Sequence, residues 1–197
     1  MREIPLTNMQ VTSKVDNVDY WRCCKHEWFG IKSRNTYYAK RYYFHRGKKI
    51  LQSLQDFLMG KPRKGYVNDH KDRDGLNNQR SSNLRLCTLE QNSYNRTNNM
   101  NGKFKYKGVR ERDGKYYAEI VFKKKKHRSK LFDTILEAAE QYDIMAMQYH
   151  KEHASLNFPE KIMEYMQREI SRHNEPEIAN MYLSLKLNYG EVTDACI

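Results

Sequence analysis

A histidine accompanied by three oxygen-bearing side chains offers the clearest chemistry in this chain. His70 directly follows Asp69, and Asn83 and Asn92 lie downstream. An imidazole is the natural base for activating water near neutral pH, because its unperturbed pKa of about 6.5 leaves it largely neutral. A carboxylate and an amide oxygen can hold Mg²⁺ or Mn²⁺, which would stabilise the oxygen leaving a phosphodiester. The pattern indicates metal-assisted hydrolysis with His70 as the base.

The same residues also allow a simpler interpretation. Asp69 and His70 could be surface loop residues, since asparagine-rich turns merely favour left-handed backbone geometry. The two asparagines and a strand at Leu84–Leu86 in register with the Asp-His pair favour the hydrolytic site.

The charge distribution indicates a polyanionic partner. Of the formal net charge of +12, residues 1–99 carry +10 (19 Lys and Arg against 9 Asp and Glu) and residues 100–159 carry +5 (13 against 8), whereas residues 160–197 carry −3 (4 against 7). Nucleic acid would therefore meet the first two segments. No apolar run approaches the roughly 20 residues that span a bilayer, and the first residues lack an apolar signal core, so we expect no membrane partner and a cytoplasmic protein. The four cysteines form no C-x-x-C pair, and we expect them to be reduced and not to bind metal.

The elements that must position the His70 region can be outlined from the pattern. Short aromatic and β-branched runs in residues 1–45 predict hairpin strands. Apolar residues from Ile50 to Leu58 recur at helical spacing, and Gly60 with Pro62 ends the predicted helix. An asparagine-rich stretch between Asn92 and Lys103 predicts a linker.

From about Ile4 to Arg96 the chain resembles HNH homing endonucleases of the His-Asn-Asn subtype, which have a ββα-metal fold. The resemblance rests on Asp69-His70, the middle Asn83 and the last Asn92, nine positions later. It implies that His70 is the general base, that Asn83 hydrogen-bonds across the loop to hold it, and that Asp69 and Asn92 bind the divalent metal. The loop between Asn78 and Asn83 is one residue longer than expected, and Gln55 stands where relatives usually have histidine.

The segment after the linker predicts a small sheet covered by one helix. The expected strands are residues 104–109, 116–125 and 127–132, with a turn at Asp113-Gly114. Thr134 and Glu137 match a capping box that opens a helix, and the helix has one apolar stripe facing the sheet. Further helical periodicity follows over residues 160–187, bracketed at first by Pro159 and Pro176.

Residues 103–159 resemble the ethylene-response-factor, or APETALA-two, DNA-binding domain, which is fused to HNH nucleases in phage and mobile-element proteins. Six blocks carry the resemblance, among them Tyr106–Arg110, Gly114–Ile120 and Leu156–Pro159. It implies base or phosphate contacts by Arg110, Arg112 and Glu119. Val121 and Arg128 depart from the plant pattern, so the target sequence cannot be carried over. Strand alternation adds further residues to the expected DNA-facing surface. These are Lys115, Tyr117, Lys123, Arg128 and Lys130.

Together these patterns predict an α+β protein. The expected order is a nuclease domain with N-terminal β-hairpins and a ββα-metal fold (1–99), a three-stranded antiparallel sheet on one helix (100–159) and an acidic helical extension (160–197). The leading hypothesis is a metal-dependent DNA endonuclease of the homing type that nicks double-stranded DNA as a monomer, without a small-molecule cofactor. A phage gene expressed in a bacterial host is compatible with it. A catalytically weak DNA-binding or regulatory protein and an RNA-binding protein stay open as alternatives.

Overall fold

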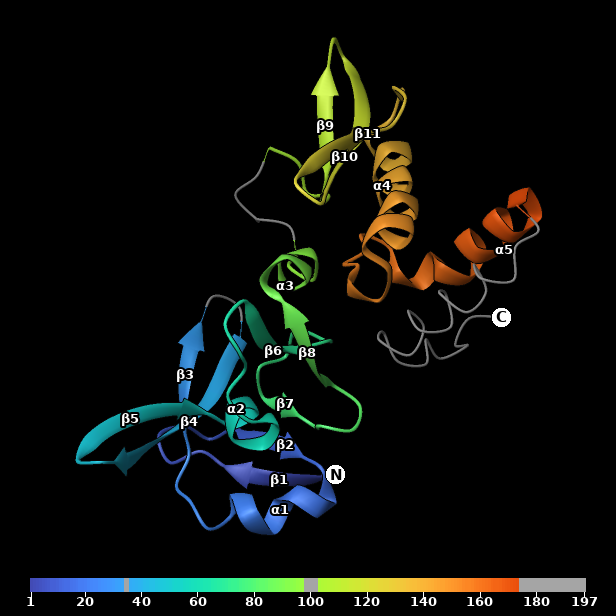
Figure 1. Ribbon diagram of the computed structural model, residues 1–197. Coiled ribbons are helices and arrows are strands. Elements are labelled where there is room, and N and C mark those ends of the chain that lie inside the picture. The colour runs from blue at the N-terminus through green and yellow to red at the C-terminus, as the bar shows by residue number, and fades with distance from the viewer. Residues whose placement is uncertain (34–35, 98–102, 174–197) are drawn as a thin grey trace. The chain divides into compact units, whose positions relative to one another are not determined.

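The structure, a computed structural model, describes residues 1–33, 36–97 and 103–173. It is a mixed α+β chain with several small sheets (Figure 1). The chain divides into two compact units, Met1–Asn92 and Ser93–Ile197. The expected linker residues 98–102, the expected boundary at 99/100, the helical pattern beyond residue 173 and Cys196 all lie outside the described residues. Within the described ranges no helix is long and apolar enough to cross a bilayer.

The first unit contains three small sheets. In one, β1 (Arg2–Pro5) pairs antiparallel with β2 (Thr12–Val15), and β7 (Asn77–Asn78) pairs parallel with β2. The second has the order β3 (Phe29–Ser33), β4 (Thr36–His45), β5 (Lys48–Ser53). The third joins β6 (Tyr66–His70) antiparallel to β8 (Leu84–Thr88). The unit also contains two short helices, α1 (Asn17–Cys23) and α2 (Leu54–Met59). A third short helix, α3 (Leu89–Tyr94), contains the division between the two units.

A single apolar cluster holds the first unit together. Trp28 is its largest member, and its indole Nε1 donates to the Cys23 carbonyl, so burial leaves no polar atom of the ring unpaired. Leu84 on β8 belongs to the same cluster. The strand that faces β6 is thereby fixed in the core. The other buried members are Ile4, Leu6, Val15, Cys23, Ala39, Leu54 and Leu58.

The helix predicted to begin at Ile50 was wrong in its first turn. Residues 48–53 form β5, whose Ile50 lies opposite Tyr43 and whose Leu51 lies opposite Tyr42. Pairing with β4 therefore overrides the local helical spacing. The helix begins after Ser53, whose hydroxyl accepts from the Asp56 amide, and it ends at Gly60, whose φ of 84° confirms the predicted stop.

In the second unit, three strands and one long helix confirm the expected sheet and helix but not the strand bounds. The sheet order is β11 (Lys125–Arg128), β10 (Lys115–Phe122), β9 (Val109–Arg112), all antiparallel. The first strand begins at Val109, where it was expected to end. Gly108, with φ +74°, breaks the extended chain there, and a side chain at this position would strike the Tyr142 ring. The predicted turn at Asp113-Gly114 is confirmed, because both residues have positive φ.

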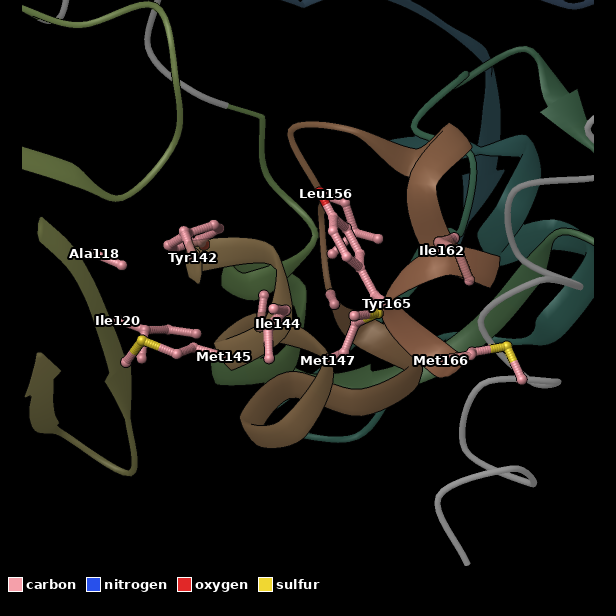
Figure 2. Packing of buried hydrophobic residues seen from close by; sticks show 12 residues of the cluster. Ala118, Ile120, Tyr142, Ile144, Met145, Met147, Leu156, Ile162, Tyr165 and Met166 are labelled. Atoms are coloured by element: carbon pink, nitrogen blue, oxygen red, sulfur yellow. The ribbon is translucent and has the colours of Figure 1, made fainter. Parts of the chain in front are cut away.

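The helix α4 (Ile135–His150) opens with the predicted capping box of Thr134 and Glu137. Its predicted stripe packs on the sheet, but the helix is also buried on a second side. Ile144 and Met147 share a cluster with Tyr165 of α5 (Ile162–His173), so α4 lies between the sheet residues Ala118 and Ile120 and the α5 residues (Figure 2). Two short 3₁₀ turns, Lys151–His153 and Pro159–Lys161, connect α4 to α5.

Candidate active site and basic sheet face

Asp69 and Arg85 face each other across the β6–β8 ladder. Their backbones are register partners, and the Arg85 Nε and Nη2 atoms lie 3.1 and 3.0 Å from Asp69 Oδ2. The two side chains are only 10% and 11% exposed. Two carboxylate–guanidinium contacts of this length form a charge-assisted pair, which offsets part of the cost of burying both groups.

The His70 ring is held by Asn78 in one tautomer. His70 is buried, and its Nε2 lies 3.1 Å from Asn78 Oδ1. The amide of Asn78 is oriented because its Nδ2 donates to Ser13 Oγ (3.0 Å) and to the Gly75 carbonyl (3.1 Å). Only the Oδ1 atom is then turned to His70, so Nε2 carries the proton and Nδ1 carries the basic lone pair.

Burial keeps the imidazole neutral. Desolvation lowers the pKa of His70 below its ordinary value, while the Asn78 hydrogen bond and the nearby carboxylates of Asp72, Asp69 and Asp74 act in the opposite direction without reversing the shift. A neutral imidazole with a defined tautomer is the form that can accept a proton.

Asn83 closes the loop that follows β6. Its Oδ1 accepts from the Asp72 amide at 3.0 Å, and its Nδ2 donates to Asp72 Oδ1 (2.9 Å) and to the Asn77 carbonyl (2.6 Å). Its backbone carbonyl accepts from the Lys71 amide. Asn83 therefore fixes residues 71–77, whereas the side chain that holds the His70 ring is Asn78, to which sequence reasoning gave no role. The only signal for Asn78 was its position beside Asn77 in the motif.

The β3–β4–β5 sheet borders this loop. The Tyr38 ring lies edge-on to His70, with centroids 5.7 Å apart. Gly75 donates its amide to Thr36 Oγ1, and a side chain at Gly75 would collide with the Tyr37 carbonyl and the Tyr38 ring. The close approach requires glycine, and it fixes strand β4 beside the candidate base.

Asn92, the second expected metal ligand, lies half-buried on α3. In the part of the chain that the structure describes, no three His, Cys, Asp or Glu side chains form a cluster suited to a metal. An amide is not among those residue types, so the expected pair of Asp69 and Asn92 would supply one carboxylate and one amide oxygen. Such oxygen ligands suit a hard cation that keeps several of its waters.

A second group of charged residues lies on the face of the β9–β10–β11 sheet. Glu119 on β10 is 8% exposed at its side chain and is enclosed by three cations: Arg128 Nε at 2.9 Å, Arg110 Nε at 3.5 Å and Lys126 Nζ at 3.8 Å. Partial burial acts to raise the pKa of Glu119, but the Arg128 hydrogen bond and the charges of Lys126 and Arg110 outweigh it and lower the pKa. The carboxylate therefore orders three cations that are themselves more than half exposed.

Most residues expected on the DNA-facing surface share this face. Directly opposite residues of an antiparallel pair lie on the same side, and the register pairs Tyr117 with Arg110 and Lys115 with Arg112. The strand positions expected for two of these residues were wrong. Lys123 lies in the β10–β11 turn with φ 48°, and Lys130 follows the end of β11. A run of lysines here forms a tight turn rather than continuing the strand, because Lys123 and Lys124 both take left-handed backbone geometry.

Part of the chain is similar to a curated viral protein. Over 93 residues it is 40% identical to an uncharacterised HNH endonuclease of Acanthamoeba polyphaga mimivirus. The similar stretch is 47% of this chain and 46% of that protein, so it spans about half the length of each. No family model matches the chain, and no solved structure matches it. The similarity is a distant homology to a protein of the HNH endonuclease class.

Proposed function

We propose that this protein is a divalent-metal-dependent DNA endonuclease of the HNH class, with His70 as general base. The observation that carries the proposal is the neutral, buried His70 ring whose Nε2–H is fixed on Asn78 Oδ1, which leaves Nδ1 as the proton acceptor. The partial similarity to a protein named as an HNH endonuclease supports the same class. The β6–β8 pair with α3 after it is compatible with the ββα fold that the sequence resemblance implies.

In this mechanism His70 Nδ1 takes a proton from water as the water oxygen attacks phosphorus and the bond to the 3′ oxygen breaks. Asn78 holds the ring, and Asn83 holds the loop beside it. Asp69 and Asn92 would hold the divalent metal, Mg²⁺ or Mn²⁺, which supplies charge stabilisation for the phosphorane and the leaving oxygen. Arg85, already paired with Asp69, holds that carboxylate in position.

We further infer that the second unit positions the DNA. The cation-rich sheet face ordered by Glu119 suits a duplex, in which arginine can read guanine edges and lysine can contact phosphate. The sequence resemblance of residues 103–159 to ethylene-response-factor domains supports this role. One such centre cuts one strand at a time, so a monomeric nickase of the homing type is the form we propose.

The weaker alternative is a DNA-binding or regulatory protein with little cleavage activity. One observation favours it: Gln55, at the position where relatives of the resembled family usually have histidine, has a buried Oε1 with no hydrogen-bond partner among the described residues. Incubation of the full chain with supercoiled plasmid, with Mg²⁺ or with EDTA, distinguishes the two. Relaxed circles in Mg²⁺ alone support the nuclease. DNA binding without any cleavage in Mg²⁺ would replace it by the alternative, and preference for structured RNA over duplex DNA would overturn both.

A further inference from the structure

The outer part of the β4–β5 hairpin, residues 40–51, forms a two-stranded arm. Its ladder continues from Lys40 opposite Ser53 to His45 opposite Lys48. The arm ends in a two-residue turn at Arg46 and Gly47, whose φ values of 49° and 73° are those of a tight hairpin turn. In Figure 1 these two strands run out from the first unit to their shared turn.

One face of the arm is apolar and exposed. Strand alternation and the register place Tyr42 and Phe44 on the same face as Leu51. Their exposures of 51%, 74% and 43% make this a continuous uncovered strip rather than a single surface side chain. Phe29 stacks on Tyr42 with centroids 5.3 Å apart, so the strip is supported from one side.

The charge around the strip decides what can cover it. The arm itself, residues 40–51, contains five Lys and Arg and neither Asp nor Glu. Within the arm, Lys49 Nζ lies 4.1 Å from the Tyr42 ring centre. A second copy of the chain would bring the same positive charge to this face, and an ordinary protein partner would need no such excess of cations. An arm with five cations and no carboxylate fits a polyanion that also offers apolar groups.

We propose that the arm enters the major groove of duplex DNA beside the cleavage site, where Phe44 and Tyr42 contact base edges and thymine methyl groups and the lysines contact phosphates. This inference rests on the proposed nuclease function for the location of the groove. A two-stranded β-ribbon has the width that the major groove admits. Phosphate contacts would set the register of the arm on the duplex, and the apolar strip would add sequence preference.

The position of the arm relative to His70 follows from strand β4. Tyr38, whose ring borders His70, and Phe44 lie on the same strand six residues apart. At about 3.3 Å per residue the separation is roughly 20 Å. For a duplex whose axis runs along β4, at about 3.4 Å per base pair, this length corresponds to roughly six base pairs.

The test uses the full chain carrying His70→Ala, which cleaves too slowly to consume the DNA during the measurement. Duplex binding is measured by fluorescence anisotropy at several salt concentrations. Lys48→Gln/Lys49→Gln should reduce the salt slope by about one to two, because each phosphate contact contributes about 0.9. The matched control is Lys14→Gln/Lys25→Gln, two exposed lysines near Glu3 and Glu27. This control should leave the slope unchanged. An equal reduction by both pairs would overturn the proposal, since charge alone would then explain the binding.

The aromatic strip is tested with Phe44→Ala, compared with Trp21→Ala, which removes an aromatic side chain that is 68% exposed on α1. Phe44→Ala should weaken duplex binding about tenfold at an unchanged salt slope, and Trp21→Ala should not. If Phe44→Ala weakened binding to single-stranded DNA but left duplex binding intact, the assignment of the arm to the major groove would be refuted. Altered sedimentation mass with intact DNA binding would instead assign the strip to self-association and also refute it.

Plasmid cleavage by the same substitutions in a chain that retains His70 separates this inference from the proposed function. Arm-dependent duplex binding without any cleavage would overturn the nuclease and leave the arm as a DNA contact. Normal cleavage with no effect of Phe44→Ala or of the lysine pair on cleavage or binding would overturn the arm and leave the nuclease.

Discussion

Asn78→Ala tests how the base is held. Asn78 is fully buried, and its truncation removes the acceptor of His70 Nε2–H and one donor to the Gly75 carbonyl. Ser13 Oγ keeps its bond to the Leu76 carbonyl, so it does not lose its last partner. Each buried polar group left unsatisfied costs about 1 to 3 kcal/mol, so the variant should lose about 2 to 6 kcal/mol of unfolding free energy.

The pH dependence of cleavage distinguishes this positioning role from a purely structural one. In the wild type the acidic limb of kcat/KM should lie below pH 6.5, because burial lowers the pKa of His70. Asn78→Ala removes a hydrogen bond that raises this pKa, so the limb should move further down. Asn78→Asp places a negative charge at the same site and should move it up.

The assays are denaturant unfolding, plasmid nicking across pH, and ¹⁵N NMR of the His70 ring. Gln79→Ala is the matched control, next to Asn78 and half-buried, and should leave the pH limb in place. A ring proton on Nδ1 in the wild type, or a limb that stays at the same pH in both Asn78 variants, would refute the assignment of Asn78 as the residue that fixes the tautomer.

Three further perturbations have expected outcomes. Arg85→Ala should cost about 3 to 5 kcal/mol of unfolding free energy, because it removes the guanidinium that pairs with the buried Asp69. Mg²⁺ should then raise the unfolding temperature of the variant more than that of the wild type. Equal shifts of the unfolding temperature would contradict metal binding at Asp69. Burial raises the pKa of Asp143 to about 7 from an ordinary 3.8. The folded protein therefore favours the neutral carboxyl, and this contribution to stability should be lost as the pH rises from about 4 through 7. Thermal unfolding of Asp143→Asn should lack this part of the pH dependence. Glu119→Gln should keep or raise the affinity for duplex DNA of random sequence. It should reduce the preference among sequences in a random-pool selection by about 1 to 3 kcal/mol, because Arg128 loses the carboxylate that orients it. An unchanged preference would show that the carboxylate has no part in sequence readout.

The sequence was informative where local chemistry decides structure. The capping box at Thr134, the stop at Gly60 and the turn at Asp113-Gly114 depend on a few adjacent residues, and each was predicted correctly. The β5 strand was missed because its apolar residues have helical spacing. The residues that make it a strand are its partners on β4, across a tight turn, and not its own neighbours in sequence.

The site itself was predictable as a set of residues but not as a set of contacts. Asn78 bonds to Ser13, 65 residues away, and no local pattern announces such a contact. The enclosure of Glu119 by three cations depends on the register of β10 with both neighbouring strands. The second buried side of α4 required α5, whose Tyr165 packs against Ile144 and Met147. Contacts between distant segments follow from the fold and not from spacing along the chain.

Cleavage of supercoiled plasmid by the full chain and by His70→Ala tests the central claim most directly. The account predicts that the wild type forms relaxed circles before linear DNA in Mg²⁺ or Mn²⁺ and does nothing in EDTA. It predicts that His70→Ala, shown to be folded by its unfolding transition, binds DNA normally but cleaves about 10² to 10⁴ times more slowly. Full activity of His70→Ala, or undiminished cutting in EDTA, would contradict it.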